Sequence, residues 1–318
     1  MVRFGNTDLY VSRLCQGTAF RHLPRADDSR GQFVLKHCLE VGVNFFDSSN
    51  AYGWGGAEEV LGKAIAGQRD QVVICTKVAA SYQPDTEGSA GKPARFTQDF
   101  LFQQAEGSLK RLNTDYIDLY LLHQPDKGTP AEEIVDAMDA LVKAGKIRYW
   151  GVSNHPATKV SEYAELTATT GKAPVSGIED YYNIAGESLN ETGDSRMHRL
   201  EHEMFPVLRR TGIGLLAFSP LDTGYLVPGR AVDSGSPLAT LIQTLDQVAQ
   251  DVGVSRAAVC VAWVLTHPEV TSVLAGSESP QAVDENFAGS VLVLPAKAIA
   301  TLNAANEAYR IQQAGERK

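Results

Sequence analysis

The sequence predicts a single parallel (β/α)8 barrel, with an N-terminal hairpin cap and extra C-terminal helices. Eight short runs rich in β-branched and aromatic residues alternate with longer segments of helical period. Helical connections with right-handed crossovers make neighbouring strands parallel, and eight such units close into a barrel. The predicted strands cover residues 13–17, 43–47, 72–77, 117–123, 147–152, 176–181, 213–218 and 271–275.

The intervening segments are polar on one face, as expected for helices that cover a barrel. They are residues 29–41, 57–66, 98–112, 131–144, 158–169 and 196–210, with two more at 238–252 and 255–266. A doubly wound sheet is the competing fold, but it would normally carry a Gly-x-Gly-x-x-Gly turn after its first strand. No such turn occurs there, so the barrel is favoured.

Three further segments extend the barrel prediction. Residues 2–11, VRFGNTDLYV, predict a hairpin under the barrel with Gly5-Asn6 as its turn. Segments 80–94 and 220–236 are rich in Gly, Pro, Ser and Asp and follow the third and seventh strands, where they are expected to shape or cover a pocket. Because no interdomain linker or repeat is visible, residues 1–318 are expected to form one domain.

Composition excludes several functional classes. The net charge of -9 and the absence of a basic cluster argue against a nucleic-acid or anionic-membrane surface. No signal peptide or membrane-spanning apolar run is visible, so we expect a cytoplasmic protein. Cys15, Cys38, Cys75 and Cys260 have neither CxxC nor metal-like spacing and are predicted to be buried free thiols.

Four polar residues follow or end predicted strands, which is where a parallel barrel carries its chemistry. Asp47 ends the second predicted strand and Tyr52 follows it, while Lys77 ends the third and His123 ends the fourth. Taken singly, these residues have ordinary interpretations: a turn residue, a loop aromatic, a solvated strand end and a core histidine. Their joint occurrence favours a proton-relay site.

Six segments, in this order along the chain, identify a resemblance: NFFDSSNAYGWGGAEEVLGKAI, CTKV, TDYIDLYLLHQPD, GKIRYWGVSN, LLAFSPL and GSESPQAVDENF. They are similar to the signature segments of the aldo-keto reductases, and the resemblance covers nearly the whole chain. It implies a (β/α)8 barrel that uses a nicotinamide cofactor without a Rossmann fold, in agreement with the missing glycine turn.

The resemblance implies that the four polar residues form a catalytic tetrad. Carbonyl reduction needs hydride from C4 of the nicotinamide and a proton for the developing alkoxide. Tyr52 is the expected general acid/base, with a pKa lowered by the Lys77 ammonium. Asp47 would hold Lys77 charged and oriented. His123 would donate a hydrogen bond to the substrate oxygen.

The resemblance also assigns a cofactor site. Ser153 and Asn154 match the pair that binds the nicotinamide carboxamide, and Phe218 matches an aromatic position, often Tyr, that stacks on its ring. Glu179 stands where the family often has Gln; a carboxylate can accept from the amide NH2 but cannot donate unless protonated. The remaining positions are Gly17, Thr18 and Asp47 near the nicotinamide end, Ser219, Pro220, Leu221, Gly224 and Leu226 over the pyrophosphate, Gly276 and Ser277 in the phosphate turn, and Glu285 and Asn286 at the adenine.

One departure from the family bears on cofactor choice. Members that prefer NADP have a basic residue near the phosphate turn, whereas this chain has Glu278 and Ala282. A carboxylate repels a 2'-phosphate but accepts a hydrogen bond from a ribose 2'-OH, which favours NAD. In the alternative, Glu278 points away and Arg230 or a neighbour of Lys77 meets the phosphate of NADP.

The expected substrate wall mixes aromatic and polar side chains, which suits a sugar; aromatic aldehydes and ring ketones also fit. Its members are Phe20, Tyr52, Trp54, Tyr82, His123, Gln124 and Tyr225, with His22 as a further candidate. An NAD preference would favour oxidation of an alcohol or aldose. Substrate identity and oligomeric state are not readable from the sequence.

Two other functional classes stay open. A class I aldolase would use Lys77 in a Schiff base, although the cofactor segments oppose it. A nicotinamide-binding regulatory subunit would use the same barrel to bind partners, although the intact tetrad and acidic surface do not support it. No metal site is predicted, because His123 and His155 lack a third ligand at suitable spacing.

Overall fold

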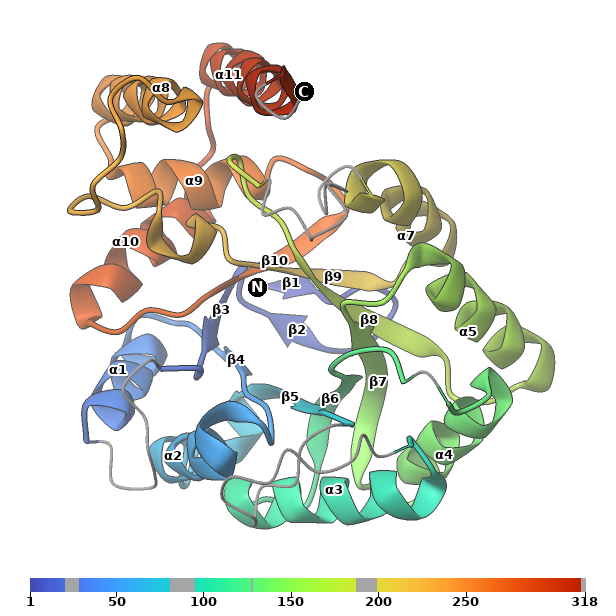
Figure 1. Ribbon diagram of the computed structural model, residues 1–318. Coiled ribbons are helices and arrows are strands. Elements are labelled where there is room, and N and C mark those ends of the chain that lie inside the picture. Colours follow the sequence, from blue (N-terminus) through green and yellow to red (C-terminus); the bar gives the residue numbers. More distant parts are fainter. Residues whose placement is uncertain (21–28, 81–94, 127, 187–198, 316–318) are drawn as a thin grey trace.

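The computed structural model describes residues 1–20, 29–80, 95–126, 128–186 and 199–315, and its centre is a closed barrel of parallel strands (Figure 1). The strands follow one another around the barrel in sequence order, and the last closes on the first. Each predicted strand is present with ends displaced by two residues or fewer. They are β3 (Leu14–Gly17), β4 (Phe45–Asp47), β5 (Val73–Val78), β6 (Ile117–Leu122), β7 (Ile147–Ser153), β8 (Val175–Tyr181), β9 (Gly214–Phe218) and β10 (Val270–Ala275).

Helices surround the barrel and bury their apolar faces against it (Figure 1). The ring consists of α1 (Ser29–Glu40), α2 (Gly56–Ala64), α3 (Gln98–Leu112), α4 (Ala131–Lys143), α5 (Ala157–Thr170), α7 (Phe205–Thr211), α9 (Arg256–Val264) and α10 (Pro280–Val291). Two extra helices, α8 (Pro237–Val252) and α11 (Ala296–Gly315), pack on each other outside α9. Together these elements confirm the predicted fold.

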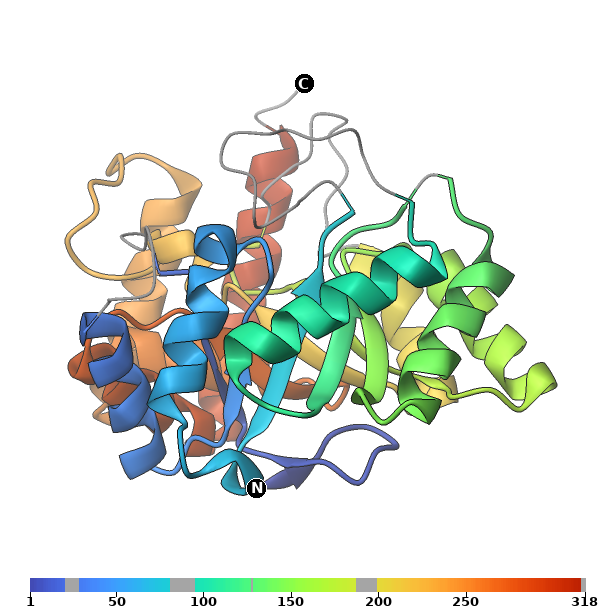
Figure 2. The ribbon, with the colours of Figure 1, turned by 90° about the horizontal axis from the view of Figure 1, so that it is seen from below.

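The N-terminal hairpin lies beneath the strands, as predicted (Figure 2). Strands β1 (Val2–Arg3) and β2 (Tyr10–Val11) pair in antiparallel, and the amide of Thr7 donates to the carbonyl of Phe4 across the Gly5-Asn6 turn at 3.1 Å. Gly5 has φ +51°, which glycine adopts without strain. A Cβ atom on Gly214 would come within 2.7 Å of the Phe4 ring, so this glycine leaves room for Phe4 to close the barrel floor.

Two apolar clusters lie on the two sides of the sheet. The larger one fills the space between the strands and the helices, and the smaller one fills the barrel interior above Phe4. All four cysteines are buried free thiols, which confirms that prediction; Cys15 and Cys75 belong to the interior cluster. The apolar interior ends where the polar side chains of Asp47, Lys77 and Glu179 begin.

One helix differs from its prediction. The segment 196–210 begins outside the described residues, and its described part is a π-helical turn, η3 (Leu200–Met204), that leads into α7. Pro206 has no amide hydrogen, so the regular i to i−4 ladder cannot continue through this position. Helical periodicity in the sequence cannot distinguish this turn from an α-helix.

Within the described residues, no single helix is long and apolar enough to cross a membrane. Helix α10 and residues 296–313 of α11 pass that test of length and composition only as a pair, and they meet at an angle of 110°.

Candidate active site

The four residues of the predicted tetrad converge at the carboxyl end of the barrel. Asp47 ends β4, Lys77 lies near the end of β5, Tyr52 begins the short 3-10 turn η1 (Tyr52–Gly55), and His123 directly follows β6. The Lys77 ammonium donates to both Asp47 carboxylate oxygens, at 2.5 and 2.6 Å, and to the Tyr52 hydroxyl at 3.3 Å. The rings of Tyr52 and His123 meet edge to face at 5.8 Å.

Lys77 is fully buried and stays charged. Burial alone would lower its pKa, but the neighbouring acidic groups, first Asp47 and then Glu179, outweigh that effect and raise the pKa well above its usual value. A fourth oxygen, the carbonyl of Ser48, also accepts from the ammonium at 3.1 Å. Lys77 is therefore a permanent positive charge beside the Tyr52 hydroxyl.

The expectation that the pKa of Tyr52 is lowered overall needs correction. Burial is the largest influence on this phenol and raises its pKa above the usual value. Lys77 acts in the opposite direction, and the negative charge of Asp47 raises the pKa further. Tyr52 is consequently a protonated phenol in the free protein, which is the form that donates a proton.

His123 is a neutral imidazole at physiological pH. Burial, followed by the nearby Lys77 charge, lowers its pKa to about 3. Its Nδ1 lies 3.2 Å from the hydroxyl of Ser49, which itself accepts from the amide of Ala51 at 3.2 Å. In the tautomer whose Nδ1 accepts from Ser49, the ring proton is on Nε2, where it can be donated to a substrate oxygen.

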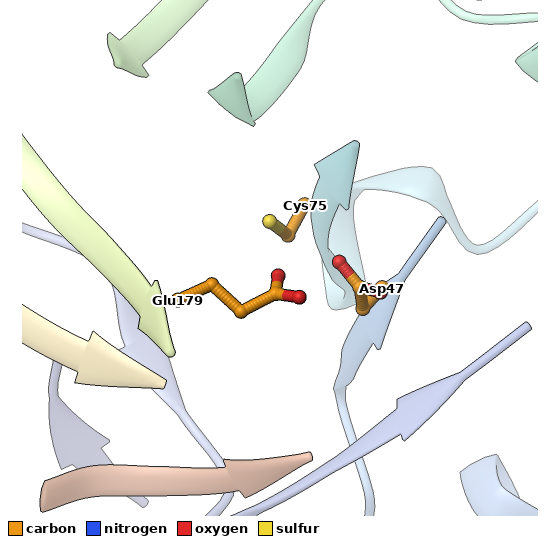
Figure 3. A group of neighbouring side chains, drawn as sticks. All are labelled: Asp47, Cys75 and Glu179. Atoms are coloured by element: carbon orange, nitrogen blue, oxygen red, sulfur yellow. The ribbon is translucent and has the colours of Figure 1, made fainter. Parts of the chain in front are cut away.

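Glu179 joins the tetrad from the opposite side of the barrel. It lies on β8, and its side chain extends across the interior toward Asp47 and Cys75 (Figure 3). Ligand atoms of Asp47, Cys75 and Glu179 all lie within 4.8 Å of one another, a spacing that could hold a metal ion. The Lys77 ammonium lies 3.1 Å from Glu179 and 2.5 Å from Asp47, so the protein supplies its own positive charge to these carboxyl groups.

The residues assigned to the nicotinamide end lie around this cluster. Ser153 is buried, and Asn154 has φ +58° and donates to the Ser153 hydroxyl at 2.9 Å and to the His123 carbonyl at 3.2 Å. Phe218 is partly exposed at the end of β9 and packs edge to face on Tyr181. On the other side, the buried Thr18 hydroxyl donates to the hydroxyl of Ser48 at 2.9 Å.

The turn after β10 has open space beside its backbone and lies next to a polar atom without a hydrogen-bond partner. Asn286 is buried and donates to the Ser277 hydroxyl at 3.0 Å, but its Oδ1 has no partner among the described residues. A Cβ atom built on Gly276 would meet nothing within 4 Å. An acceptor of this kind suits an adenine amino group, and open backbone near the start of α10 suits a phosphate. These residues therefore fit a nicotinamide dinucleotide.

The loop after β9 is held by contacts of its own. Asn183 donates to the carbonyl of Ser219 at 2.9 Å, and the amide of Gly224 donates to the carbonyl of Leu221 at 2.9 Å. Leu226 is buried, as is Pro220, while Gly17 is buried at the end of β3. The loop therefore has a defined shape at the carboxyl end of the strands.

Two charged residues bear on the NADP alternative. Arg230 stacks over the Tyr225 ring at 3.7 Å and donates to the Thr223 carbonyl at 3.2 Å, so its guanidinium is held by the loop after β9. Glu278 precedes the N-cap Ser279, whose hydroxyl accepts from the amide of Ala282. Glu285, one turn along α10, accepts from Gln281 at 3.0 Å.

The predicted substrate wall is only partly assembled. Phe20 is buried and Gln124 and Tyr225 are exposed on loops at this end of the barrel, while Tyr82 and His22 lie outside the described residues. The place of Trp54 in the wall stays a prediction. Gly53 and Trp54 have φ of 55° and 56°, and Trp54 also lines a cavity with residues of α2 and α3.

Three site residues escaped the sequence reasoning. Ser49 orients His123, and Asn50 accepts from the amide of Ala79 at 3.3 Å and so ties the chain after β4 to the end of β5. Gln16 is buried and donates to the carbonyls of Gly17 and Ser277, joining the two ends of the predicted cofactor site. The polar run DSSN after an apolar strand was the available signal for Ser49 and Asn50.

The sequence is similar to those of several known proteins over most of its length. An oxidoreductase of unassigned activity from Bacillus subtilis, YrpG, is 31% identical, with 94% of this chain and 93% of that protein covered. A rice protein named as a probable voltage-gated potassium channel subunit beta is 30% identical over 89% of this chain and 88% of its own. L-glyceraldehyde 3-phosphate reductase from Escherichia coli is 28% identical, with 84% and 80% covered.

Structure and family comparison agree. The fold is similar to that of an aldo-keto reductase from Bacillus halodurans in its holo form, with a TM-score of 0.77, 25% identity and coverage of 96% of this chain and 95% of that one. The family model described as the aldo/keto reductase family matches residues 13–307. The chain therefore belongs to the aldo/keto reductase family.

Proposed function

We propose that this protein is an NAD(P)-dependent oxidoreductase that transfers hydride between a nicotinamide and a carbonyl or alcohol, with Tyr52 as general acid/base. The observation that carries the proposal is the hydroxyl of Tyr52, 3.3 Å from a buried ammonium and beside a neutral imidazole. When bound, the nicotinamide supplies or accepts the hydride. All other steps belong to residues of the chain.

In the reducing direction, Tyr52 Oη gives its proton to the carbonyl oxygen as negative charge develops there. The ammonium of Lys77 stabilises the phenolate that remains, and Asp47 keeps this ammonium oriented through its two short contacts. His123 donates from Nε2 to the same oxygen and so aligns the carbonyl. In the oxidising direction, Tyr52 takes the proton of the alcohol.

We propose NAD rather than NADP as the preferred cofactor, because Glu278 and Ala282 stand where a basic residue would meet a 2'-phosphate. The alternative, a preference for NADP, would use Arg230 to meet the 2'-phosphate; its guanidinium is held on the loop after β9. A sugar or sugar-derived substrate is consistent with the aromatic Phe20 and Tyr225 and the polar Gln124, which all follow strands at this end of the barrel. An NAD preference would favour the oxidative direction.

One observation favours a second candidate function. Relatives in rice and Arabidopsis thaliana are named as probable potassium channel beta subunits, so a nicotinamide-binding regulatory subunit with little turnover is the alternative. This role would keep nucleotide binding and lose steady-state reduction of simple aldehydes.

The test is a fluorescence titration of the protein with NADH and NADPH, followed by turnover assays with aldehydes, aldoses and alcohols. Three tryptophans report binding. We expect tighter NADH binding, and we expect Glu278→Arg to raise NADPH affinity while Glu162→Arg, the same charge change on α5, leaves it unchanged. Binding without any turnover would favour the regulatory role, and binding of neither nucleotide would refute both functions.

A further inference from the structure

Glu179 gives the active site one carboxyl group more than its positive charge can balance. Among the described residues, the ion pairs of Asp47 and Glu179 are made only with Lys77. The other titratable groups facing this cluster supply no positive charge to balance a second carboxylate. They are the thiols of Cys15 on β3 and Cys75 on β5, the phenol of Tyr52 on η1 and the neutral imidazole of His123 after β6. Two ionised carboxylates would leave an uncompensated buried negative charge.

The hydrogen bonds of Lys77 point to the same imbalance. An ammonium has three protons, and the Asp47 carboxylate, the Ser48 carbonyl and the Tyr52 hydroxyl all accept from it. Glu179 Oε2 lies 3.1 Å from the nitrogen but receives no directed hydrogen bond, and it has no other partner among the described side chains. A buried carboxylate oxygen that accepts no hydrogen bond lowers the stability of the folded protein.

Protonation of Glu179 removes both the excess negative charge and the ionised oxygen that lacks a hydrogen bond. Burial, then the charge of Asp47, raises the pKa of Glu179 well above its usual value, and the opposing effect of the Lys77 ammonium is too small to reverse this shift. The protonated pair carries one negative charge, which Lys77 neutralises. The free protein therefore holds Glu179 as a carboxylic acid.

We propose that Glu179 couples the binding of oxidised nicotinamide to the release of one proton. The inference rests on the proposed function, because it requires a nicotinamide that reacts beside Tyr52. Hydride and proton add to adjacent atoms of one carbonyl group, so a reactive nicotinamide ring lies near the Tyr52 and Lys77 pair and the Glu179 carboxyl. An oxidised ring carries a positive charge and a reduced ring is neutral.

The charges balance in both states. Before binding, the cluster holds anionic Asp47, cationic Lys77 and neutral Glu179. When the oxidised ring adds a positive charge, Glu179 gives its proton to solvent and becomes the matching anion; after the ring is reduced, Glu179 takes a proton back. Glutamine at this position could not make this change. The affinity for the oxidised form should therefore rise with pH, by up to about tenfold per pH unit.

The experiment is calorimetric titration of the protein with oxidised and reduced NAD and NADP, in pairs of buffers with different heats of ionisation at one near-neutral pH. The dependence of the measured heat on the buffer gives the number of protons released. We expect nearly one proton for the oxidised form that binds and close to none for its reduced form. Glu179→Gln should bind both forms and release none.

Asp180→Asn is the matched control, since it alters the next carboxylate along β8 and should keep the wild-type proton release. Equal release by wild type and Glu179→Gln, or equal release with oxidised and reduced cofactor, would overturn the proposal while leaving the proposed function intact. The comparison of oxidised with reduced cofactor uses only the wild-type protein, so it remains valid even if Glu179→Gln fails to fold. Failure of every form to bind the wild type would refute the proposed function and this proposal together.

Discussion

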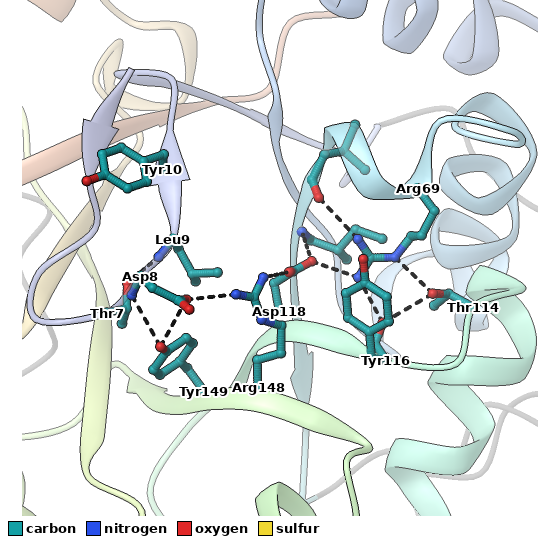
Figure 4. Close-up of polar contacts among 12 residues, drawn as sticks. Thr7, Asp8, Leu9, Tyr10, Arg69, Thr114, Tyr116, Asp118, Arg148 and Tyr149 are labelled. Carbon is teal, nitrogen blue, oxygen red and sulfur yellow. Dashed lines mark hydrogen bonds and ion pairs between the residues drawn. The ribbon is translucent and has the colours of Figure 1, made fainter.

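The two ends of the barrel each hold a cluster of charges, and the clusters are built differently. At the amino end, Asp118 lies between two guanidiniums, at 2.7 Å from Arg69 and 2.9 Å from Arg148, and Arg148 also contacts Asp8 at 2.7 Å (Figure 4). Asp118 further accepts from the amide of Ile74 at 3.0 Å. Two positive and two negative charges balance in this floor network.

At the carboxyl end, the Lys77 cluster of Asp47, Lys77, Glu179 and Tyr52 sets two carboxyl groups against one ammonium. One oxygen of Glu179 has no hydrogen-bond partner among the described residues, whereas both oxygens of Asp118 are paired. Structural charges are expected to be balanced and satisfied, while groups that move protons are held in perturbed states. The difference separates a cluster that stabilises the fold from one that carries out chemistry.

The largest expected effect is on turnover. Tyr52→Phe removes the proton donor and keeps the ring, so we expect kcat to fall by about 10²–10⁴-fold while nucleotide affinity stays nearly unchanged. Steady-state kinetics and a nucleotide titration on the same preparation measure the two quantities. A variant that retained wild-type kcat would remove Tyr52 from the mechanism and place the proton donor elsewhere in the cluster.

The second prediction breaks the floor network. Asp118→Ala leaves Arg69 and the amide of Ile74 without their buried acceptor, and we expect the free energy of unfolding to fall by about 3–5 kcal/mol. Denaturant titration measures this loss. Because Asp118 lies at the end of the barrel away from Tyr52, kcat per folded molecule should not change; a large decrease in kcat would contradict the separation of the two clusters.

The third prediction sharpens the comparison through pH. The raised pKa of Glu179 means that the native state keeps a proton that the unfolded chain releases, so this group's contribution to stability is lost as pH rises above the usual glutamate range. Glu179→Gln has no such proton. We expect its stability relative to wild type to increase by about 1.4 kcal/mol per pH unit above that range.

Urea unfolding of both proteins at several pH values measures this difference. Glu162→Gln, an exposed carboxylate that pairs with Lys159 on α5, is a control that should track the wild type at every pH. Parallel profiles for Glu179→Gln and wild type would mean that Glu179 is ionised in the native protein.

Sequence patterns were sufficient for the barrel and for the tetrad. Strand ends such as Asp47 and Lys77 could be located because apolar runs end abruptly there, and parallel strands bring their carboxyl ends together. The direction of the pKa shift of Tyr52 could not be obtained in this way. It depends chiefly on how deeply the assembled barrel buries this phenol, which no local sequence pattern reports.

Local backbone geometry was a second feature that could not be predicted from the sequence. Trp54 was predicted as a rim aromatic, but the sequence did not show the two successive positive φ angles at Gly53 and Trp54, nor the cavity that Trp54 lines with residues of α2 and α3. The floor network also gave no pattern in the sequence, since Asp8, Arg69, Asp118 and Arg148 come from four separate segments. Such sites become visible only when the strands are assembled.

The smallest expected effect concerns the outer edge of the floor network. The side chain of Asp8 is 69% exposed and contacts Arg148 at 2.7 Å and the Tyr149 hydroxyl at 3.0 Å. Water can replace these contacts, so Asp8→Ala should lower the free energy of unfolding by no more than about 1 kcal/mol, with a smaller effect in high salt. Denaturant titrations at two salt concentrations test this expectation. A loss as large as that of Asp118→Ala would mean that the hairpin, rather than Asp118, holds the network together.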